Sequence, residues 1–286
     1  MDQGVRPALS VCGYAEQLSV RLRTPSDKNP NDVYVGTVVL PGGCGRAHAY
    51  VKVFPPASRL QLVYNEVIAH KLALQFDLPS PITFPCACSI KLLRSGSRAF
   101  MVPDARYPFV LAVASFDGAL KDTRQMVSSS AAQIADILNW PHAARVAVFD
   151  ELLGNDDRHL ENLVRRGPHD YMLIDNERIL FGEPWFGREL DEFRARHNDA
   201  NILASTIGEA TDEVMRQRMM SIAQYFVSGS LLEVPDVADQ LEQLCLAPEG
   251  ITPRLITMLN GRRTLLRSLM HYHLRKGDLF QARTNR

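Results

Sequence analysis

Residues 154–162 read Gly154-Asn155-Asp156-Asp157-Arg158-His159-Leu160-Glu161-Asn162, and this polar stretch decides how the rest of the chain is interpreted. An apolar helical pattern precedes it at residues 144–153, and a strand-like pattern follows at residues 171–174. A polar segment between a helix and a strand is predicted to form an exposed loop, where binding and catalytic side chains concentrate. The ordinary alternative is a solvated loop without a function.

Asp157, His159 and Asn162 are the candidate catalytic residues of this loop. A carboxylate and a carboxamide at this spacing are predicted to converge on one side of the loop. Asp157 then receives or orients the proton of an acceptor hydroxyl, and Asn162 offers an uncharged oxygen to Mg²⁺. These roles indicate phosphoryl transfer, in which the protein mainly positions groups and neutralises charge.

Asp175 ends the apolar strand-like segment Met172-Leu173-Ile174. An aspartate at the end of a strand is most often a turn former. Its spacing from Asp157 favours the other interpretation, a carboxylate that holds Mg²⁺ on the ATP phosphates. Asn162 and Asp175 are therefore the predicted metal ligands.

Lys52 lies within the apolar strand-like segment Tyr50-Val51-Lys52-Val53-Phe54. Because successive side chains of a strand point to opposite faces, the Lys52 side chain either faces solvent or lies inside a cleft. Glu66, on a helix predicted at residues 58–76, is the expected partner in an ion pair that directs the ammonium group toward ATP. The alternative places Glu66 on the exposed surface of that helix.

The bulk composition is that of an ordinary globular protein, and 286 residues suffice for two lobes. Lys plus Arg equals Asp plus Glu at 32 each, so a broad basic field and a nucleic-acid partner are not expected. No apolar run has the length of a signal peptide or a membrane span. We expect a cytoplasmic location, although an effector secreted without a signal peptide fits the same observation. The five cysteines form no CxxC pair and predict neither disulfides nor a zinc site.

Strand-like patterns gather in the first hundred residues, and helical patterns dominate the remainder. Strands are predicted at residues 18–23, 33–40, 48–54, 83–93, 99–102 and 171–174. Helices are predicted at residues 58–76, 129–138, 141–153, 189–196, 211–226, 237–246 and 253–276. This order predicts an α+β fold with a small β-rich lobe (residues 1–104) and a larger helical lobe (residues 105–286).

These motifs resemble those of HipA-like kinases, a branch of the kinase-fold proteins related to the phosphatidylinositol kinases. The catalytic loop of that group reads Gly-x-x-Asp-Arg-His-x-x-Asn, as residues 154–162 do here. Asn65-Glu66-Val67-Ile68-Ala69 and Leu78-Pro79-Ser80-Pro81 are similar to the family's glutamate helix and the proline turn after it. The similarity covers about residues 45–185.

The resemblance implies a protein-kinase-like two-lobed fold with ATP and Mg²⁺ as cofactors. It implies that Lys52 is the ATP-site lysine, Asp157 the catalytic aspartate, and Asn162 and Asp175 the metal ligands. It also implies that Asp150 anchors the catalytic loop from the preceding helix.

The chain departs from the family pattern at several places. Asp175 is followed by Asn176 and Glu177 instead of Phe-Gly, and the loop at residues 24–32 contains no glycine to cover the phosphates. The chain is shorter than the full toxin kinases, so a toxin role is not implied. Gly42, Gly43 and Gly45 are predicted to form a plain turn.

The resemblance implies a serine or threonine of a protein as the acceptor. A small-molecule or lipid kinase is the first alternative, and a pseudokinase that acts as a nucleotide-dependent interaction module is the second. Acidic residues accompany the cations after Asp175, which disfavours a lipid headgroup site. These cations are Arg178, Arg188, Arg194, Arg196 and His197. The sequence predicts neither the partner proteins nor the oligomeric state.

Overall fold

A computed structural model describes the fold of most of the chain. It describes residues 12–20, 32–54, 59–94, 109–116, 130–159, 162–209, 213–228, 241–242 and 248–284. The chain divides into two compact units, one formed by residues 1–67 with 81–118 and the other by residues 68–80 with 119–286.

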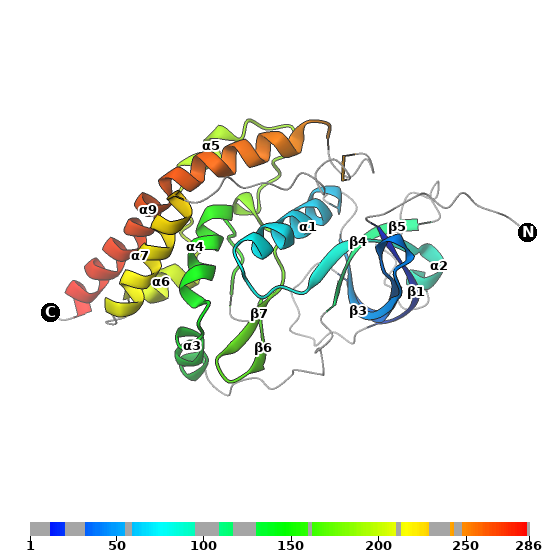
Figure 1. Ribbon diagram of the computed structural model, residues 1–286, viewed down its shortest axis with the longest axis horizontal. Helices are drawn as coiled ribbons and strands as arrows, with labels where there is room; N and C mark the ends of the chain where they lie inside the picture. The colour runs from blue at the N-terminus through cyan, green and yellow to red at the C-terminus, as the bar shows by residue number, and fades with distance from the viewer. Residues whose placement is uncertain are drawn as a thin grey trace, which may run out of the picture. The chain divides into compact units, whose positions relative to one another are not determined.

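The first unit contains a closed barrel in the strand order β1-β2-β3-β5-β4. Its strands are β1 (Gly13–Val20), β2 (Asp32–Val39), β3 (Arg46–Val53), β4 (Ile82–Ser89) and β5 (Phe109–Phe116) (Figure 1). Neighbouring strands run antiparallel except β1 and β4, which pair in parallel and close the barrel. The mixed helix and strand content and the β-rich N-terminal region confirm the α+β prediction. The closed barrel differs from the sheet of a kinase lobe, because the β1–β4 pairing leaves no open edge.

Alternating apolar side chains fill the barrel. Val51 and Val53 on β3 and Phe84, Cys86 and Cys88 on β4 are buried in one cluster. Residues two apart on a strand share a face, so this spacing places each set on the inner side. The glycines between β2 and β3 form the predicted turn, which includes a short 3₁₀ segment at Pro41–Gly43.

The strands at residues 33–40 and 48–54 are confirmed to within two residues. The prediction of a strand through residue 93 was wrong, because β4 ends at Ser89 and helix α2 (Ile90–Arg94) follows. β1 begins before the predicted residue 18, and β5 was not predicted. The loop predicted at residues 24–32 lies outside the described residues except for Asp32, which begins β2. The strand predicted at 99–102 also lies outside them.

Helix α1 (Arg59–Gln75) confirms the helix predicted at residues 58–76 and belongs in part to each unit. Residues 63–70 are buried on every side. A helix that is buried all round needs apolar residues around its whole circumference. Asn65, Glu66 and His70 are the polar exceptions within this stretch.

The second unit is mainly helical. Its helices are α3 (Ser130–Leu138), α4 (Ala143–Leu153), α5 (Asp191–Arg194), α6 (Ile202–Glu209), α7 (Glu213–Ser228) and α9 (Ile251–Thr284). The long helix α9 packs against α4, α5, α6 and α7 (Figure 1). α4 is buried along nearly its whole length, so the residues at its C-terminal end are held in the interior of the unit.

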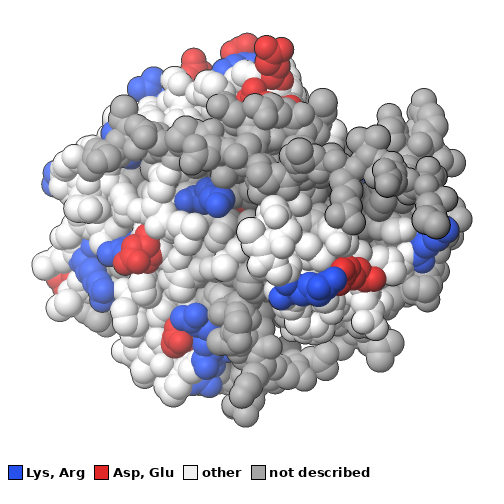
Figure 2. All heavy atoms as spheres, turned by 45° about the vertical axis from the view of Figure 1, so that its right-hand side comes forward, with Lys and Arg blue, Asp and Glu red and all other residues white. Residues whose placement is uncertain are grey.

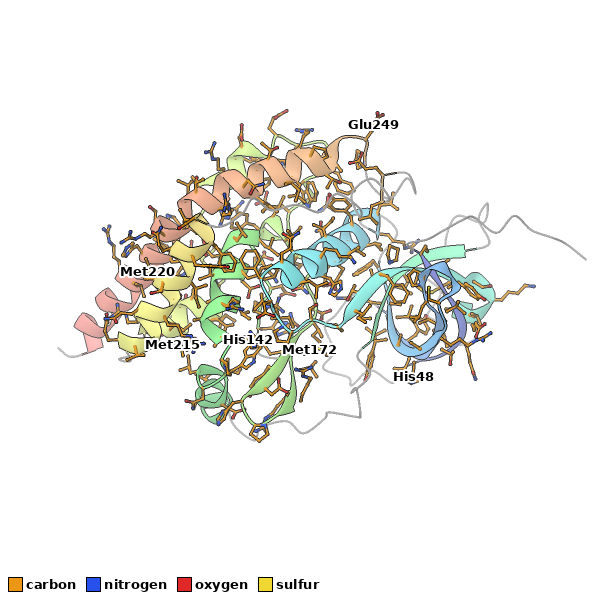
Figure 3. All side chains as sticks on the ribbon, in the orientation of Figure 1. His48, His142, Met172, Met215, Met220 and Glu249 are labelled. Atoms are coloured by element: carbon orange, nitrogen blue, oxygen red, sulfur yellow. The ribbon has the colours of Figure 1, made fainter. Side chains whose placement is uncertain are left out.

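A two-stranded hairpin follows the loop that begins at Gly154. It consists of β6 (Leu163–Gly167) and β7 (Asp170–Leu173), paired antiparallel. Met172, labelled in Figure 3, lies on β7 and is buried. The amide of Leu173 donates to the carbonyl of Pro79 at 2.8 Å. The hairpin is thereby attached within the unit at the point where β7 leads into Asp175.

The helices of the second unit largely confirm the predictions, but two of its elements were not predicted. The predicted helices at 129–138, 141–153, 211–226 and 253–276 correspond to α3, α4, α7 and α9. The helix predicted at 189–196 is reduced to α5, and most of the one at 237–246 lies outside the described residues. β6 and α6 were not predicted, because each is short and its apolar residues do not recur at a clear strand or helix spacing.

Positive and negative side chains are interspersed on the face drawn in Figure 2, and among the described residues neither sign forms a broad field there. None of the described helices combines the length and the apolar character that crossing a membrane requires.

Candidate active site

Lys52 and Glu66 form an ion pair in the first unit. The Lys52 Nζ lies 3.6 Å from Oε1 of Glu66, and the two side chains are only 9% and 8% exposed. The Lys52 ammonium also lies 5.3 Å from the centre of the Phe54 ring. This confirms the predicted pairing and excludes a fully exposed Lys52. A buried carboxylate fixes the direction of the ammonium group, because each charge needs the other once water is removed.

Gly154 ends α4 and begins the candidate catalytic loop. Its φ of 61° lies in the left-handed region, and its N–H is directed at the carbonyls of Asp150 and Glu151. A Cβ at this position would meet the ring of Phe181 at 3.0 Å. The Phe181 amide donates to the Gly154 carbonyl at 2.7 Å. Only glycine satisfies both the backbone conformation and this close approach.

Arg158 is the buried centre of the loop. Its Nε donates to Oδ2 of Asp150 at 3.1 Å, and both side chains are completely buried. Nη1 donates to the carbonyl of Ile174 at 2.6 Å and to that of Asn162 at 3.2 Å. Nη2 donates to Oδ1 of Asn176. One guanidinium therefore connects α4, the end of the loop and the segment after β7, which confirms that Asp150 anchors the loop.

Burial and the Arg158 guanidinium act in opposite directions on the pKa of the Asp150 carboxyl. Burial raises the pKa of the Asp150 carboxyl above its ordinary value, while the Arg158 guanidinium and the Asn155 amide act in the opposite direction. The Asn155 amide lies 3.4 Å from Oδ1 of Asp150. Buried ion pairs of this kind contribute to a unique geometry more reliably than to stability.

Asn162 and Asp157 are held together by a side-chain hydrogen bond. The Asn162 Nδ2 donates to the carbonyl of Asp157 at 2.7 Å. The Asp157 amide donates to Oδ1 of Asn155 at 3.2 Å. The first bond orients the Asn162 amide, whose oxygen is a hard donor of the type that Mg²⁺ accepts. Asp157 is partly exposed, as a residue that meets an acceptor must be.

Within the part of the chain that the structure describes, the contacts of His159 that bear on the site come from its backbone. Its amide donates to the Asp157 carbonyl at 2.8 Å, and its carbonyl accepts from the Asn162 amide at 3.0 Å. These bonds form the turn that brings Asp157 and Asn162 together. The side chain of His159 is partly exposed, and its predicted catalytic role stays a prediction.

Asp175 adopts a left-handed backbone conformation, with φ of 58°. Left-handed conformations are uncommon in residues other than glycine, although aspartate tolerates them better than most. Its neighbours are fixed, since Arg158 binds both the Ile174 carbonyl and Asn176. The amide of Ile174 also donates to the carbonyl of Asn162 at 3.1 Å. Strained residues held by their surroundings cluster at functional sites.

Each unit contains some of the predicted residues. Lys52 and Glu66 meet in the first unit. In the second unit, hydrogen bonds bring together the backbone of Asp157, His159, Asn162 and the segment that carries Asp175. Carboxylate and amide oxygens make these residues of the second unit suitable for a hard cation such as Mg²⁺.

Some residues that hold the loop were missed by the sequence analysis. Asn155 and Asn176 are buried and bind Asp157 and Arg158 respectively. Asn155 lies within the quoted loop motif and Asn176 directly follows Asp175, and these positions were a usable signal. Asn198 donates to the carbonyl of Asn155 at 2.7 Å. Nothing in the sequence near Asn198 pointed to that contact.

Three of the cations after Asp175, namely Arg178, Arg188 and Arg196, are paired with carboxylates. Arg178 binds both oxygens of Asp156 at 2.9 Å. Arg188 lies 2.7 Å from Glu183 and from Glu192, and Arg196 binds Glu183 as well. This confirms that acidic residues offset these three cations, and for Arg194 and His197 the offset stays a prediction.

No protein-family model matches the chain, and no curated protein matches it significantly. The resemblance to HipA-like kinases therefore rests on the motifs quoted above.

Proposed function

We propose that this chain is an ATP- and Mg²⁺-dependent phosphotransferase of the HipA-like kinase type, with a kinase-like two-lobed fold and a protein serine or threonine as acceptor. The observation that carries the proposal is the guanidinium of Arg158. It ties Asp150, Asn162 and the two neighbours of Asp175 into one arrangement. A fully satisfied buried polar network fixes one geometry, which a catalytic loop requires.

Each residue has a role in the proposed reaction. Lys52, directed by Glu66, binds phosphate oxygens of ATP. Asn162 and Asp175 hold Mg²⁺, which when bound neutralises charge on the phosphates. Asp157 orients the acceptor hydroxyl and takes its proton. The acceptor oxygen forms a bond to the γ-phosphorus, the bond from that phosphorus to the bridging oxygen breaks, and ADP leaves.

A lipid acceptor fits less well than a protein acceptor. Arg178, Arg188 and Arg196, the cations that would clamp a phosphorylated headgroup, are each bound to carboxylates. The closed barrel and the missing Phe-Gly after Asp175 set this chain apart from a typical kinase. Neither removes a group that the reaction requires.

The test is transfer of labelled phosphate from ATP to protein acceptors in a cell extract, with and without Mg²⁺. Asp157→Asn should lower the rate at least 100-fold. Asp156→Asn is the matched control, because it removes the adjacent carboxylate and should keep most of the activity. Equal rates for wild type and Asp157→Asn would reject the assignment of Asp157. Binding of Mg-ATP without transfer to any acceptor would favour the pseudokinase alternative.

A further inference from the structure

Asn198 connects α4 to the start of the candidate catalytic loop. Its side chain is 1% exposed. The Nδ2 group donates to the carbonyl of Asn155 at 2.7 Å and lies 3.3 Å from that of Asp150. Its backbone amide donates to Oε1 of Glu151 at 3.1 Å. One asparagine therefore holds both the last turn of α4 and the second residue of the loop.

Helix α9 supports this asparagine through Glu151. Arg262 on α9 forms an ion pair with Oε1 of Glu151 at 3.1 Å, the same oxygen that accepts from Asn198. The His273 Nε2 lies 2.9 Å from the other oxygen, and all three side chains are completely buried. Arg262 also donates to the carbonyl of Phe193, a few residues before Asn198. The segment that carries Asn198 is thus attached to α9 and to α4.

A chain of hydrogen bonds leads from Asn198 to Asp157. Asn198 binds the carbonyl of Asn155, and Oδ1 of Asn155 accepts the amide of Asp157 at 3.2 Å. Arg158 holds the opposite side of the loop through Asp150. Asn198 contacts none of the residues assigned to ATP or Mg²⁺ through the hydrogen bonds described here. An effect on the reaction would therefore arise from the orientation of the loop.

We propose that Asn198 is a positioning residue that orients Asp157 toward the acceptor hydroxyl, with Arg262 of α9 holding it in place. This inference rests on the proposed phosphotransferase function. It assigns the C-terminal helix a part in the acceptor step that neither the loop motif nor the family resemblance indicated. A displacement of a reacting group by about 1 Å is enough to lower a rate 100-fold.

Asn201 provides a matched control. It is also completely buried, and its Nδ2 donates to a carbonyl of α4, that of Ala147, at 2.8 Å. Its Oδ1 accepts the amide of Ala204 at 3.0 Å at the start of α6. Asn198 and Asn201 thus share residue type, burial and attachment to α4. The described contact to the loop distinguishes Asn198.

The experiment compares Asn198→Ala, Asn198→Asp and Asn201→Ala with wild type in the phosphate-transfer assay and in chemical unfolding. Both alanine variants should lower the unfolding midpoint by similar amounts. The Asn198 variants should lower kcat about 10- to 100-fold, with the KM for ATP within about twofold of wild type. Asn201→Ala should keep kcat within about threefold. Asn198→Asp keeps the size of the side chain but removes its hydrogen-bond donors. It therefore replaces Asn198→Ala in the assay if the alanine variant does not fold.

Equal kcat values for the Asn198 and Asn201 variants would overturn the positioning role and leave the phosphotransferase function standing. If wild type transfers no phosphate, amide hydrogen exchange decides the inference separately. The Asp157 amide should then exchange at least about tenfold faster in Asn198→Asp than in Asn201→Ala. Equal exchange rates in the two variants would overturn the inference in that case also.

Discussion

The guanidinium of Arg158 and the carboxylate of Asp150 form an ion pair with both side chains completely buried, and the Nε of Arg158 lies 3.1 Å from Oδ2 of Asp150. The same guanidinium binds the carbonyls of Asn162 and Ile174 and the side chain of Asn176. A planar group with several fixed donors can meet all these acceptors at once, and an ammonium group cannot. The loop geometry therefore depends on arginine at this position and not only on a positive charge.

Arg158→Lys should destabilise the protein strongly. The lysine retains the charge but cannot satisfy Asp150 and the carbonyl acceptors together, and an incompletely compensated buried charge costs about 3–5 kcal/mol. Urea unfolding followed by circular dichroism measures the change in the free energy of unfolding. Arg178→Lys is the control, since its pair with Asp156 is half exposed and should change stability by less than about 1 kcal/mol. Similar losses in the two variants would contradict the central role of Arg158.

The local elements with a strong hydrophobic period were predictable from the sequence. The strand around Lys52 is an example, because alternation identifies it. The helix of Glu66 is buried on every side over residues 63–70 and was identified by its length and by the prolines that follow it. β5 was missed because Phe109–Phe116 is one short continuous apolar run. Such a run does not distinguish a buried strand from a buried helix.

The identity and the order of the candidate site residues were predictable from the sequence. The residues whose hydrogen bonds hold them in place were not. Asp157, Asn162 and Asp175 lie in or beside recognisable motifs. The bonds of Arg158 to Ile174 and Asn176, and that of Asn198 to Asn155, join residues that are distant in sequence. Tertiary hydrogen bonds of this kind leave no periodic pattern in the sequence. The pairing of β1 with β4, which closes the barrel, also joins residues that are distant in sequence and could not be predicted for the same reason.

Lys52→Met and Glu66→Gln should show strong energetic coupling. Removing Lys52 takes the ammonium group away from the buried Glu66 carboxylate, so the single variant should lose about 3–5 kcal/mol. The double variant should recover about 1–3 kcal/mol of the summed losses in a double-mutant cycle of urea unfolding. The exposed pair of Arg46 with Glu16 should give no measurable coupling in the same assay. If the stability loss of the double variant equals the sum of the two single losses, the two charges do not stabilise each other.

Asp175→Asn should separate stability from metal binding. Asparagine tolerates the left-handed conformation at least as well as aspartate, so stability should stay within about 1 kcal/mol of wild type. The loss of the carboxylate should lower Mg²⁺-dependent phosphate transfer at least about 100-fold. Titration of the transfer rate with Mg²⁺ measures the effect, and removal of Mg²⁺ by a chelator should abolish transfer by wild type. A variant with an unchanged Mg²⁺ dependence would exclude Asp175 as a ligand.

The buried His70 should make the protein less stable in acid. Burial lowers the pKa of His70 to about 4, and its Nδ1 lies 3.0 Å from Oγ of Ser80. In the unfolded chain the pKa is near 6.5, so below that value the unfolded state binds a proton that the folded state does not. Stability from this group is fully present above pH 6.5 and is lost as the pH falls toward 4. The loss between pH 7 and pH 5 should be about 2 kcal/mol.

Urea unfolding of wild type and His70→Asn across this pH range tests that expectation. Asparagine keeps a polar group near the position of Nδ1, and the part of the pH dependence due to His70 should disappear. His271→Asn, at an exposed position on α9, should follow the wild-type profile. Parallel profiles for His70→Asn and wild type would show that His70 does not cause the acid sensitivity.

Gly154→Ala should lower the free energy of unfolding more than Gly250→Ala does. Both glycines are left-handed, with φ of 61° and 71°, so each substitution carries a backbone cost of about 1–2 kcal/mol. A Cβ at Gly250 meets no atom within 4 Å, whereas at Gly154 it lies 3.0 Å from the Phe181 ring. Phe181 cannot retreat freely because its amide binds the Gly154 carbonyl. Urea unfolding should therefore show an additional loss of about 1–3 kcal/mol for Gly154→Ala. Equal losses of unfolding free energy at the two positions would mean that the Phe181 ring moves aside. The contact with Phe181 would then not fix the start of the loop.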